Sequence, residues 1–248
     1  MSDRITERND MSKQSWKPGN MLYPVPAVMV SCKRPGEKAN IITLAWAGTI
    51  CSDPAMLSVS IRPERYSYDI IKETKEFVVN LVTNDLTRAC DWCGVRSGKD
   101  YDKFKENKLT EFTSEFMDTP AIEESPVNIY CKVKKIEKLG SHHMFIAEVV
   151  GVTVDEKYMD KKGRFDLKAT NLMAYSHGEY FALGKQLGTF GYSVKKSTKK
   201  STKKSKPGTK SGTKSGSKSG NNSSNKSGNK NGSKSGNNSR KKSDKKKH

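Results

Sequence analysis

Two arginines flank the start of a predicted helix, and their spacing suits the binding of a phosphate group. Arg62 and Arg65 lie on either side of Pro63, a residue that fits the first helical turn because its missing N–H is not needed there. Free backbone N–H groups and the helix dipole at such a start favour an anion, and the planar donors of arginine match phosphate. Two hydroxyl donors lie nearby, Ser60 and Ser67. The alternative is that the arginines only pair with nearby acidic residues, Glu64 and Asp69.

A C-x-x-C motif, Cys90-Asp91-Trp92-Cys93, is the second candidate for chemistry. A redox dithiol or half of a zinc site needs two thiolates close together. The sequence has no second C-x-x-C, and its histidines do not form an H-x-x-x-H or H-E-x-x-H set. The motif falls in a predicted helix, where cysteines three apart share a face. We therefore expect no metal site, and whether Cys90 and Cys93 are redox active stays open.

The elements that position these residues are predicted to be mainly antiparallel strands. Each strand has either alternating or continuous apolar residues and ends at a turn signal. The predicted strands are Met21–Cys32, Asn40–Trp46, Met56–Arg62, Glu76–Val82, Pro126–Lys138 and His143–Asp155. Short helices are expected after Pro63, from a cap at Asn84 or Asp85 to about Cys93, and up to Glu106. We interpret Ala47-Gly48 as an interruption after the second strand, and the segment Asp166–Tyr192 has no clean period.

This pattern of hairpin-connected strands predicts a Greek-key antiparallel barrel with a few short helices. No G-x-G-x-x-G motif follows a strand and no Walker A motif exists, so a Rossmann domain or a P-loop enzyme is not expected. No apolar run approaches the ~20 residues that span a bilayer, and the N-terminus has no apolar stretch of a secretory signal. Five irregularly spaced cysteines give no disulfide framework. A reducing cytoplasm is the expected location.

The basic charge of the chain is concentrated in its last 54 residues. The whole chain has a formal net charge of +19, and residues 195–248 hold 18 lysines and one arginine against one aspartate. The first 194 residues are therefore nearly neutral, with 27 basic and 26 acidic side chains. The tail has no apolar residue, so we expect it to be disordered and to attract polyanions such as nucleic acid, acidic lipid or a cell-surface polymer. The alternative is a non-essential low-complexity extension.

An ordered set of motifs runs through the nearly neutral part. The segment Asn40–Leu81 contains N-x-x-T-x-A-W, C-S-D-P, S-I-R-P-x-R-Y-S-Y and E-F-V-V-N-L, in that order. CGVRSGKDYDKF (Cys93–Phe104) and AYSHGEYFALGKQLGTFGYSV (Ala174–Val194) follow. Together these motifs resemble the flavin reductase-like, flavoredoxin-type family of FMN-binding split barrels. The resemblance implies a homodimer with one FMN per subunit near the dimer interface.

The resemblance also divides the chain into three parts. We expect a flexible N-terminus over residues 1–15, a flavin reductase-like FMN-binding split β-barrel domain over residues 16–194, and the basic tail over residues 195–248. The tail lies outside the resemblance.

The isoalloxazine ring of a flavin needs a flat apolar surface with a few polar groups at its pyrimidine edge. Asn40, Thr43 and the backbone from Ala45 to Gly48 could supply that edge, because small residues let the chain approach closely. Trp46 could line the pocket or belong to the core. The resemblance puts the counterpart of Cys51 close to the flavin, and the alternative is a small buried apolar residue.

Lys99 and Asp102 could contact the phosphate or the ribityl chain, or could be solvated helix charges. The residues expected to bind the cofactor are Asn40, Thr43, Ala45, Trp46, Ala47, Gly48, Cys51, Ser60, Arg62, Arg65, Tyr66, Ser67, Lys99 and Asp102.

The expected activity is that of an NAD(P)H-dependent flavin reductase. FMN would accept a hydride from NADH or NADPH and pass electrons to a free flavin, a metal complex or a protein. The alternative is a flavoredoxin-like electron carrier that exchanges electrons with another protein and has no nicotinamide site of its own. Because the cofactor carries the chemistry, no residue is assigned a catalytic role.

Overall fold

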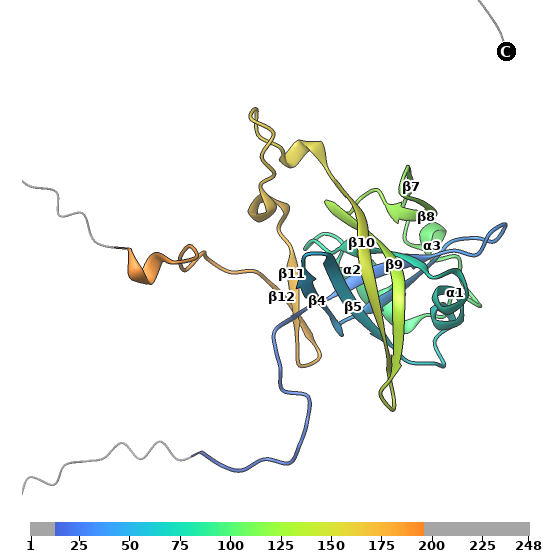
Figure 1. The fold of residues 1–248 in the computed structure, drawn as a ribbon, viewed down its shortest axis with the longest axis horizontal. Helices are drawn as coiled ribbons and strands as arrows, with labels where there is room; N and C mark the ends of the chain where they lie inside the picture. The colour runs from blue at the N-terminus through green and yellow to red at the C-terminus, as the bar shows by residue number, and fades with distance from the viewer. Residues whose placement is uncertain (1–12, 196–248) are drawn as a thin grey trace, which may run out of the picture. The chain divides into compact units, whose positions relative to one another are not determined.

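The computed structural model describes residues 13–195, and its main feature is a seven-stranded antiparallel sheet (Figure 1). The strand order is β3-β2-β6-β9-β10-β5-β4. The strands are β2 (Val28–Cys32), β3 (Asn40–Leu44), β4 (Ala47–Ser52), β5 (Ala55–Ile61), β6 (Glu76–Leu81), β9 (Val127–Lys138) and β10 (His143–Val154). The predicted mainly β fold is confirmed.

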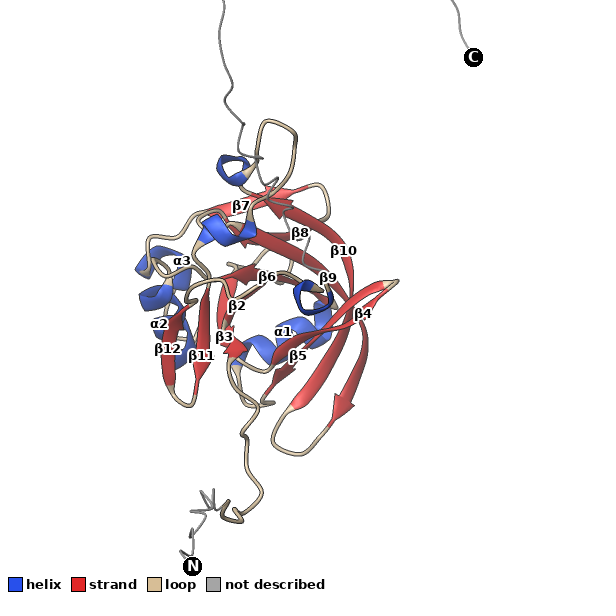
Figure 2. Cartoon of the chain, turned by 90° about the vertical axis from the view of Figure 1, so that its left-hand side faces the viewer, coloured by secondary structure: helices blue, strands red, loops and turns tan. Residues whose placement is uncertain are grey.

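The two outer strands of the sheet, β3 and β4, are consecutive in the sequence. Only Ala45 and Trp46 separate them, and the N–H of Ser60 in β5 donates to the carbonyl of Trp46 at 2.8 Å. A two-residue connection between opposite edges requires the sheet to curl, and Figure 2 shows the strands bending round into a half-barrel. The interpretation of Ala47-Gly48 as an interruption was wrong, because these residues begin β4.

Apolar side chains of alternate residues in β2 lie in two of the three separate apolar cores. Val28 and Val30 of β2 face a core inside the barrel, together with Phe77 and Phe145. Met29, between them, faces a second core with helix α2 (Thr87–Val95) and short helix α3 (Lys103–Glu106). Strand β2 is therefore buried on both faces, which explains its continuous apolar sequence.

The helix near Pro63 begins later than the sequence predicts. Residues 62–65 first form a turn, in which the N–H of Arg65 donates to the carbonyl of Arg62 at 3.0 Å. Helix α1 then covers Tyr66–Thr74, with Arg65 as its N-cap. The second helix also begins late, because Asn84 and Asp85 lie in the turn before α2 and Leu86 takes the N-cap position.

Two hairpins were not predicted from the sequence, and the predicted strand Met21–Cys32 is divided into two strands, β1 (Val25–Pro26) and β2. Strands β7 (Glu111–Ser114) and β8 (Met117–Ile122) pair with each other, and β11 (Met173–Ser176) pairs with both β12 (Glu179–Ala182) and β1 (Val25–Pro26). These strands are four to six residues long, or two in β1, and lack a long alternating pattern. Three-residue and four-residue 3₁₀ turns occur at Glu156–Tyr158 and Leu167–Thr170.

The chain divides into two compact units after Gly188. The first unit contains the sheets and helices described above. The second contributes residues 189–195 to the described part, with a 3₁₀ turn at Tyr192–Val194. The predicted disorder of residues 1–15 and 195–248 falls almost entirely outside the described residues. No helix among residues 13–195 is long and apolar enough to cross a bilayer.

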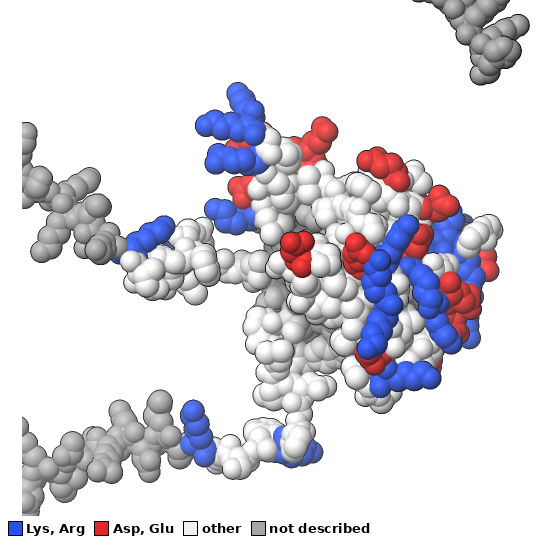
Figure 3. Space-filling model, viewed as in Figure 1, with Lys and Arg blue, Asp and Glu red and all other residues white. Residues whose placement is uncertain are grey.

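Acidic and basic side chains are interspersed on the outer surface of the barrel, as Figure 3 shows for one face. On β9 and β10, Lys134 pairs with Glu148 at 2.5 Å, and Lys132 pairs with Glu76 of β6 at 3.6 Å. This mixed surface agrees with the near-neutral charge of the first 194 residues.

Candidate functional site

A small polar cavity lies where β3, the start of α1 and the chain before α3 meet. Its volume is about 190 Å³. Four of the residues expected to bind the cofactor line it: Asn40, Arg65, Tyr66 and Ser67. Other lining residues include Ile42, Glu64, Val95, Arg96, Ser97, Gly98 and Lys103. We call it the Arg65 cavity.

The first turn of α1 presents free donors to this cavity. The N–H of Tyr68 donates to the carbonyl of Arg65 at 2.8 Å, but no side chain caps the N-terminus of α1, which leaves the N–H groups of Tyr66 and Ser67 without a capping oxygen. Ser67, in that turn, accepts a hydrogen bond from Asn40 Nδ2 at 2.7 Å and is almost fully buried. The guanidinium of Arg65 donates to the carbonyl of Gly94 at the end of α2. This contact holds the positive charge of Arg65 beside the helix start, which suits an anion.

Asn40 has a buried polar atom that lacks a partner. Its Nδ2 is bonded to Ser67, but its Oδ1 accepts no hydrogen bond from any described residue. A buried acceptor without a donor is costly, so such an atom at the edge of a cavity indicates a ligand that donates to it. The hydroxyl groups of a ribityl chain have this chemistry.

Lys103 is a site residue that the sequence analysis missed. Its side chain is 3% exposed, and its Nζ donates to the carbonyls of Ile41 at 2.6 Å and Cys93 at 2.7 Å. An ammonium group has three donors, so one remains for the cavity that Lys103 lines. Burial, together with the nearby Arg65, lowers the pKa of Lys103 to about 8, and an anion in the cavity would raise it again.

A signal for Lys103 was present in the sequence. It stands in the motif from Cys93 to Phe104, only four residues after Lys99, which was chosen instead. Its position gives a second hint, because a lysine in the first turn of a helix opposes the dipole and therefore needs another partner.

Lys99 and Asp102 line an adjoining cavity of about 260 Å³, which shares Asn40, Tyr66 and Gly98 with the Arg65 cavity. Asp102 has structural partners: its carboxylate caps α3 by accepting from the N–H of Lys105 at 3.2 Å and pairs with Lys38 at 3.2 Å. These contacts hold the pKa of Asp102 below its usual range. The predicted contact of Asp102 with a ligand must therefore compete with its capping role.

The structure does not bring Arg62 into the Arg65 cavity. Arg62 lines a different and larger cavity of about 820 Å³, together with two other predicted residues, Trp46 and Ser60. His142 and Ser141 from the β9–β10 turn and residues 19–22 complete its lining. We call it the Arg62 cavity. The two arginines therefore do not flank one helix start as the sequence suggested.

The remaining predicted residues lie on β3, β4 and their connection. The hydroxyl of Thr43 donates to the carbonyl of Cys90 at 2.5 Å, so it joins β3 to α2. Ala47 and Gly48 pair with β5 along one side, and the other side of β4 has no strand partner among the described residues. Ala45 is half-buried in the connection. Cys51 is half-buried near the end of β4, with its Sγ 3.5 Å from the carbonyl of Asp53.

The C-x-x-C residues are buried in the core under α2. Cys90 and Cys93 are free thiols with no exposed surface. Burial raises the pKa of Cys90 to about 12 and that of Cys93 to about 11, so both hold their protons at neutral pH. No group of three metal-ligating side chains occurs within residues 13–195. This environment favours the structural role for both cysteines.

Comparison with known proteins defines the class to which this fold and site belong. A family model described as the flavin reductase like domain matches residues 20–184, and the chain belongs to this family. The half-barrel is therefore the split barrel of that family, and the chain is a flavin-binding redox protein. The predicted family is confirmed.

Individual relatives agree with this class. An uncharacterized protein of Archaeoglobus fulgidus is 32% identical over 160 residues, which cover 64% of this chain and 88% of the relative. Flavoredoxin of Desulfovibrio vulgaris (Miyazaki F) is 30% identical, with a TM-score of 0.69, and the match covers 74% of this chain and 100% of the flavoredoxin. Flavoredoxin from Methanosarcina acetivorans is 25% identical, with a TM-score of 0.67 and the same coverage.

Proposed function

We propose that the chain binds FMN and acts as an oxidoreductase that takes electrons from NADH or NADPH. The observation that carries the choice of FMN is the Arg65 cavity. It combines two arginines, Arg65 and Arg96, one buried lysine and the uncapped start of α1 in about 190 Å³. This space and charge suit one terminal phosphate. A bound FMN supplies hydride and electron transfer, which no side chain of the protein can perform alone.

The roles of the binding residues follow from their positions. Arg65, Ser67 and Lys103 hold the phosphate with the first-turn N–H groups of α1. Asn40 accepts from the ribityl chain, beside Tyr66 and Lys99 in the adjoining cavity. The connection Ala45–Trp46 and the edge of β4 that has no strand partner among the described residues would border the isoalloxazine ring, with Cys51 near the end of that strand. These residues bind and orient the cofactor and exclude water.

The second candidate is a flavoredoxin-like electron carrier. Two flavoredoxins match along their whole length, which favours this alternative to the flavin reductase. The two functions differ in whether the protein itself oxidises a nicotinamide nucleotide. Anaerobic mixing of the flavin-loaded protein with NADH or NADPH decides between them. Bleaching of the flavin absorbance supports the reductase, and an unchanged spectrum that bleaches only with a protein donor supports the carrier.

The identity of the cofactor is tested separately. Flavin released by heat from the purified protein is expected to run as FMN on chromatography. FAD alone, or no flavin after reconstitution, contradicts the proposal.

We also propose a homodimer in the cytoplasm, with the barrel domain over residues 16–194 and the tail as a polyanion-binding extension. Several large apolar side chains of the first unit are more than 60% exposed, and a second copy would cover them: Trp16, Leu183 and Leu187. Light scattering after size-exclusion chromatography measures the oligomeric state, and a monomer contradicts this proposal.

A further inference from the structure

The turn after β5 separates two arginines that are only three residues apart. Strand β5 ends at Ile61, which pairs with His143 of β10, so Arg62 emerges beside the β9–β10 turn. The chain then turns through Pro63 and Glu64, and Arg65 occupies the N-cap position of α1 beside the end of α2. Each arginine therefore lines its own cavity. If Arg65 serves the flavin phosphate, the large Arg62 cavity still has a cation without an assigned ligand.

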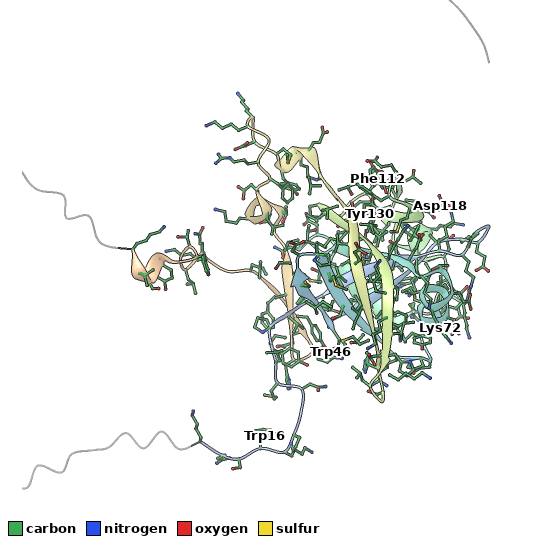
Figure 4. All side chains as sticks on the ribbon, viewed as in Figure 1. Trp16, Trp46, Lys72, Phe112, Asp118 and Tyr130 are labelled. Carbon is green, nitrogen blue, oxygen red and sulfur yellow. The ribbon has the colours of Figure 1, made fainter. Side chains whose placement is uncertain are left out.

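The wall of the Arg62 cavity combines apolar and polar groups. Trp46, labelled in Figure 4, is half-buried and packs on Tyr23, with ring centroids 6.1 Å apart. Met21 and Leu22 add apolar surface. Arg62, His142 and Ser60 add donors on the β5 and β9–β10 side. A flat apolar wall beside a cluster of donors suits a planar ring that carries an oxyanion.

The donors of this cavity are available to a ligand. Arg62 pairs with Glu64 at 3.4 Å, but the two side chains are 53% and 63% exposed. An exposed ion pair contributes little, so an incoming anion can replace Glu64 at small cost. The Nδ1 of His142 lies 3.0 Å from the hydroxyl of Ser141, which leaves Nε2 for a ligand. Burial and the neighbouring Arg62 lower the pKa of His142, and Glu64 opposes this effect.

We propose that the Arg62 cavity is a second ligand site, distinct from the site of the flavin phosphate, which takes an aromatic molecule bearing an oxyanion. The ring packs on Trp46, and the oxyanion accepts from Arg62, His142 and Ser60. Because Trp46 also borders the proposed flavin ring, a ligand in this site would lie beside the cofactor. The proposal deepens the proposed function and rests on it for the assignment of Arg65 to the flavin phosphate and for the position of the flavin ring beside Trp46.

The test uses the full chain loaded with flavin and measures ligand binding by isothermal titration calorimetry. The probes form two pairs that differ only in charge: AMP with adenosine, and benzoate with benzyl alcohol. At least one charged probe is expected to bind, and its neutral counterpart at least tenfold more weakly. Binding of AMP alone indicates a site for a nucleotide phosphate, and binding of benzoate alone indicates a site for an aromatic carboxylate. Binding of both indicates that the site recognises any aromatic molecule with an oxyanion. No binding by either charged probe overturns the proposal.

Three variants locate the binding. Arg62→Ala and His142→Gln are expected to weaken binding of the charged probe, and the loss of affinity is expected to be tenfold or more for Arg62→Ala. Arg88→Ala is the matched control, because Arg88 is exposed on α2 and lines neither cavity. All variants keep the basic tail, so non-specific attraction of anions to the tail is the same in each. An equal loss in Arg62→Ala and Arg88→Ala overturns the proposal.

FMN affinity separates this proposal from the proposed function. Arg65→Ala is expected to weaken FMN binding and Arg62→Ala to change it less than twofold. Arg62→Ala could lower the ratio of FMN affinity to riboflavin affinity as strongly as Arg65→Ala does. In that case the Arg62 cavity binds the flavin phosphate and the second site is refuted. If neither arginine affects FMN but Arg62→Ala abolishes probe binding, the second site stands and the Arg65 assignment fails.

Discussion

Asn40 of β3 and Ser67 of α1 are joined by a buried hydrogen bond of 2.7 Å, although they lie 27 residues apart. This contact fixes the start of α1 against the barrel strand that borders the Arg65 cavity. It also orients the Asn40 side chain so that Oδ1, which has no partner among the described residues, borders that cavity.

Replacing Gly98 by alanine should disturb this arrangement. A Cβ at Gly98 would lie 2.1 Å from Asn40 Oδ1 and 2.8 Å from Tyr66 Cδ1, which is too close without movement of one of the groups. We expect Gly98→Ala to weaken the binding of FMN and of riboflavin equally, because the displaced side chains border the proposed position of the ribityl chain, which both flavins have. Fluorescence titration measures both affinities. Gly184→Ala is the control, since its Cβ meets nothing within 4 Å.

Arg65→Ala should weaken FMN binding tenfold or more and leave riboflavin nearly unchanged. A hydrogen bond to a charged group contributes about 1.5–3 kcal/mol, and riboflavin lacks the phosphate that accepts it. Quenching of flavin fluorescence gives both dissociation constants. Equal losses for the two flavins would instead indicate a defect in folding.

Lys103→Met should have two separable effects. Loss of the positive charge lowers the ratio of FMN to riboflavin affinity. Loss of the donor leaves the carbonyls of Ile41 and Cys93 without it, which lowers the free energy of unfolding by about 1–3 kcal/mol for each group that stays buried and unpaired. Titration with both flavins and urea unfolding of the flavin-free protein measure the two effects. An unchanged affinity ratio would remove Lys103 from the phosphate site.

Stability should fall as the pH rises above about 9, because buried thiols must keep their protons. Burial raises the pKa of Cys131 to about 12, and Cys32 and Cys90 are raised to a similar value. The unfolded chain releases these protons near pH 9, so the stabilisation is complete below that pH and is lost as the pH approaches 12.

The pH dependence can be assigned to one residue with Cys131→Val. The variant removes one titrating thiol and should reduce the slope of unfolding free energy against pH by up to about 1.4 kcal/mol per pH unit. Urea unfolding between pH 8 and pH 10.5 measures the slope. An identical slope in both proteins would show that Cys131 titrates normally in the native state.

Truncation after Val194 should preserve flavin binding and turnover. The removed residues carry a net charge of +18 and no apolar side chain, whereas the family match ends at residue 184. Binding to heparin or DNA should be lost with the tail, and in the full chain it should weaken steeply with salt. The prediction fails if the truncated protein loses its flavin or still binds the polyanion.

The sequence by itself determined the class of the protein and most of its sheet. Strands with long apolar patterns, such as Met56–Arg62 and Glu76–Val82, were predicted close to their observed bounds, because side-chain periodicity is a local property. The ordered motifs from Asn40 to Leu81 were sufficient for the family. The hairpins β7–β8 and β11–β12 were missed, since their short strands are stabilised by packing on the barrel.

Only the tertiary structure decided how the polar residues divide between two cavities. In sequence, Arg62 and Arg65 look like one phosphate site, because nothing local reveals the turn that precedes α1. Lys103 shows the opposite case, in which residues distant in sequence meet in one site. It is 38 residues from Arg65, and the packing of α3 against β3 brings its ammonium group to the same cavity. Burial and the direction of a side chain depend on which elements meet, and that is a property of the folded chain.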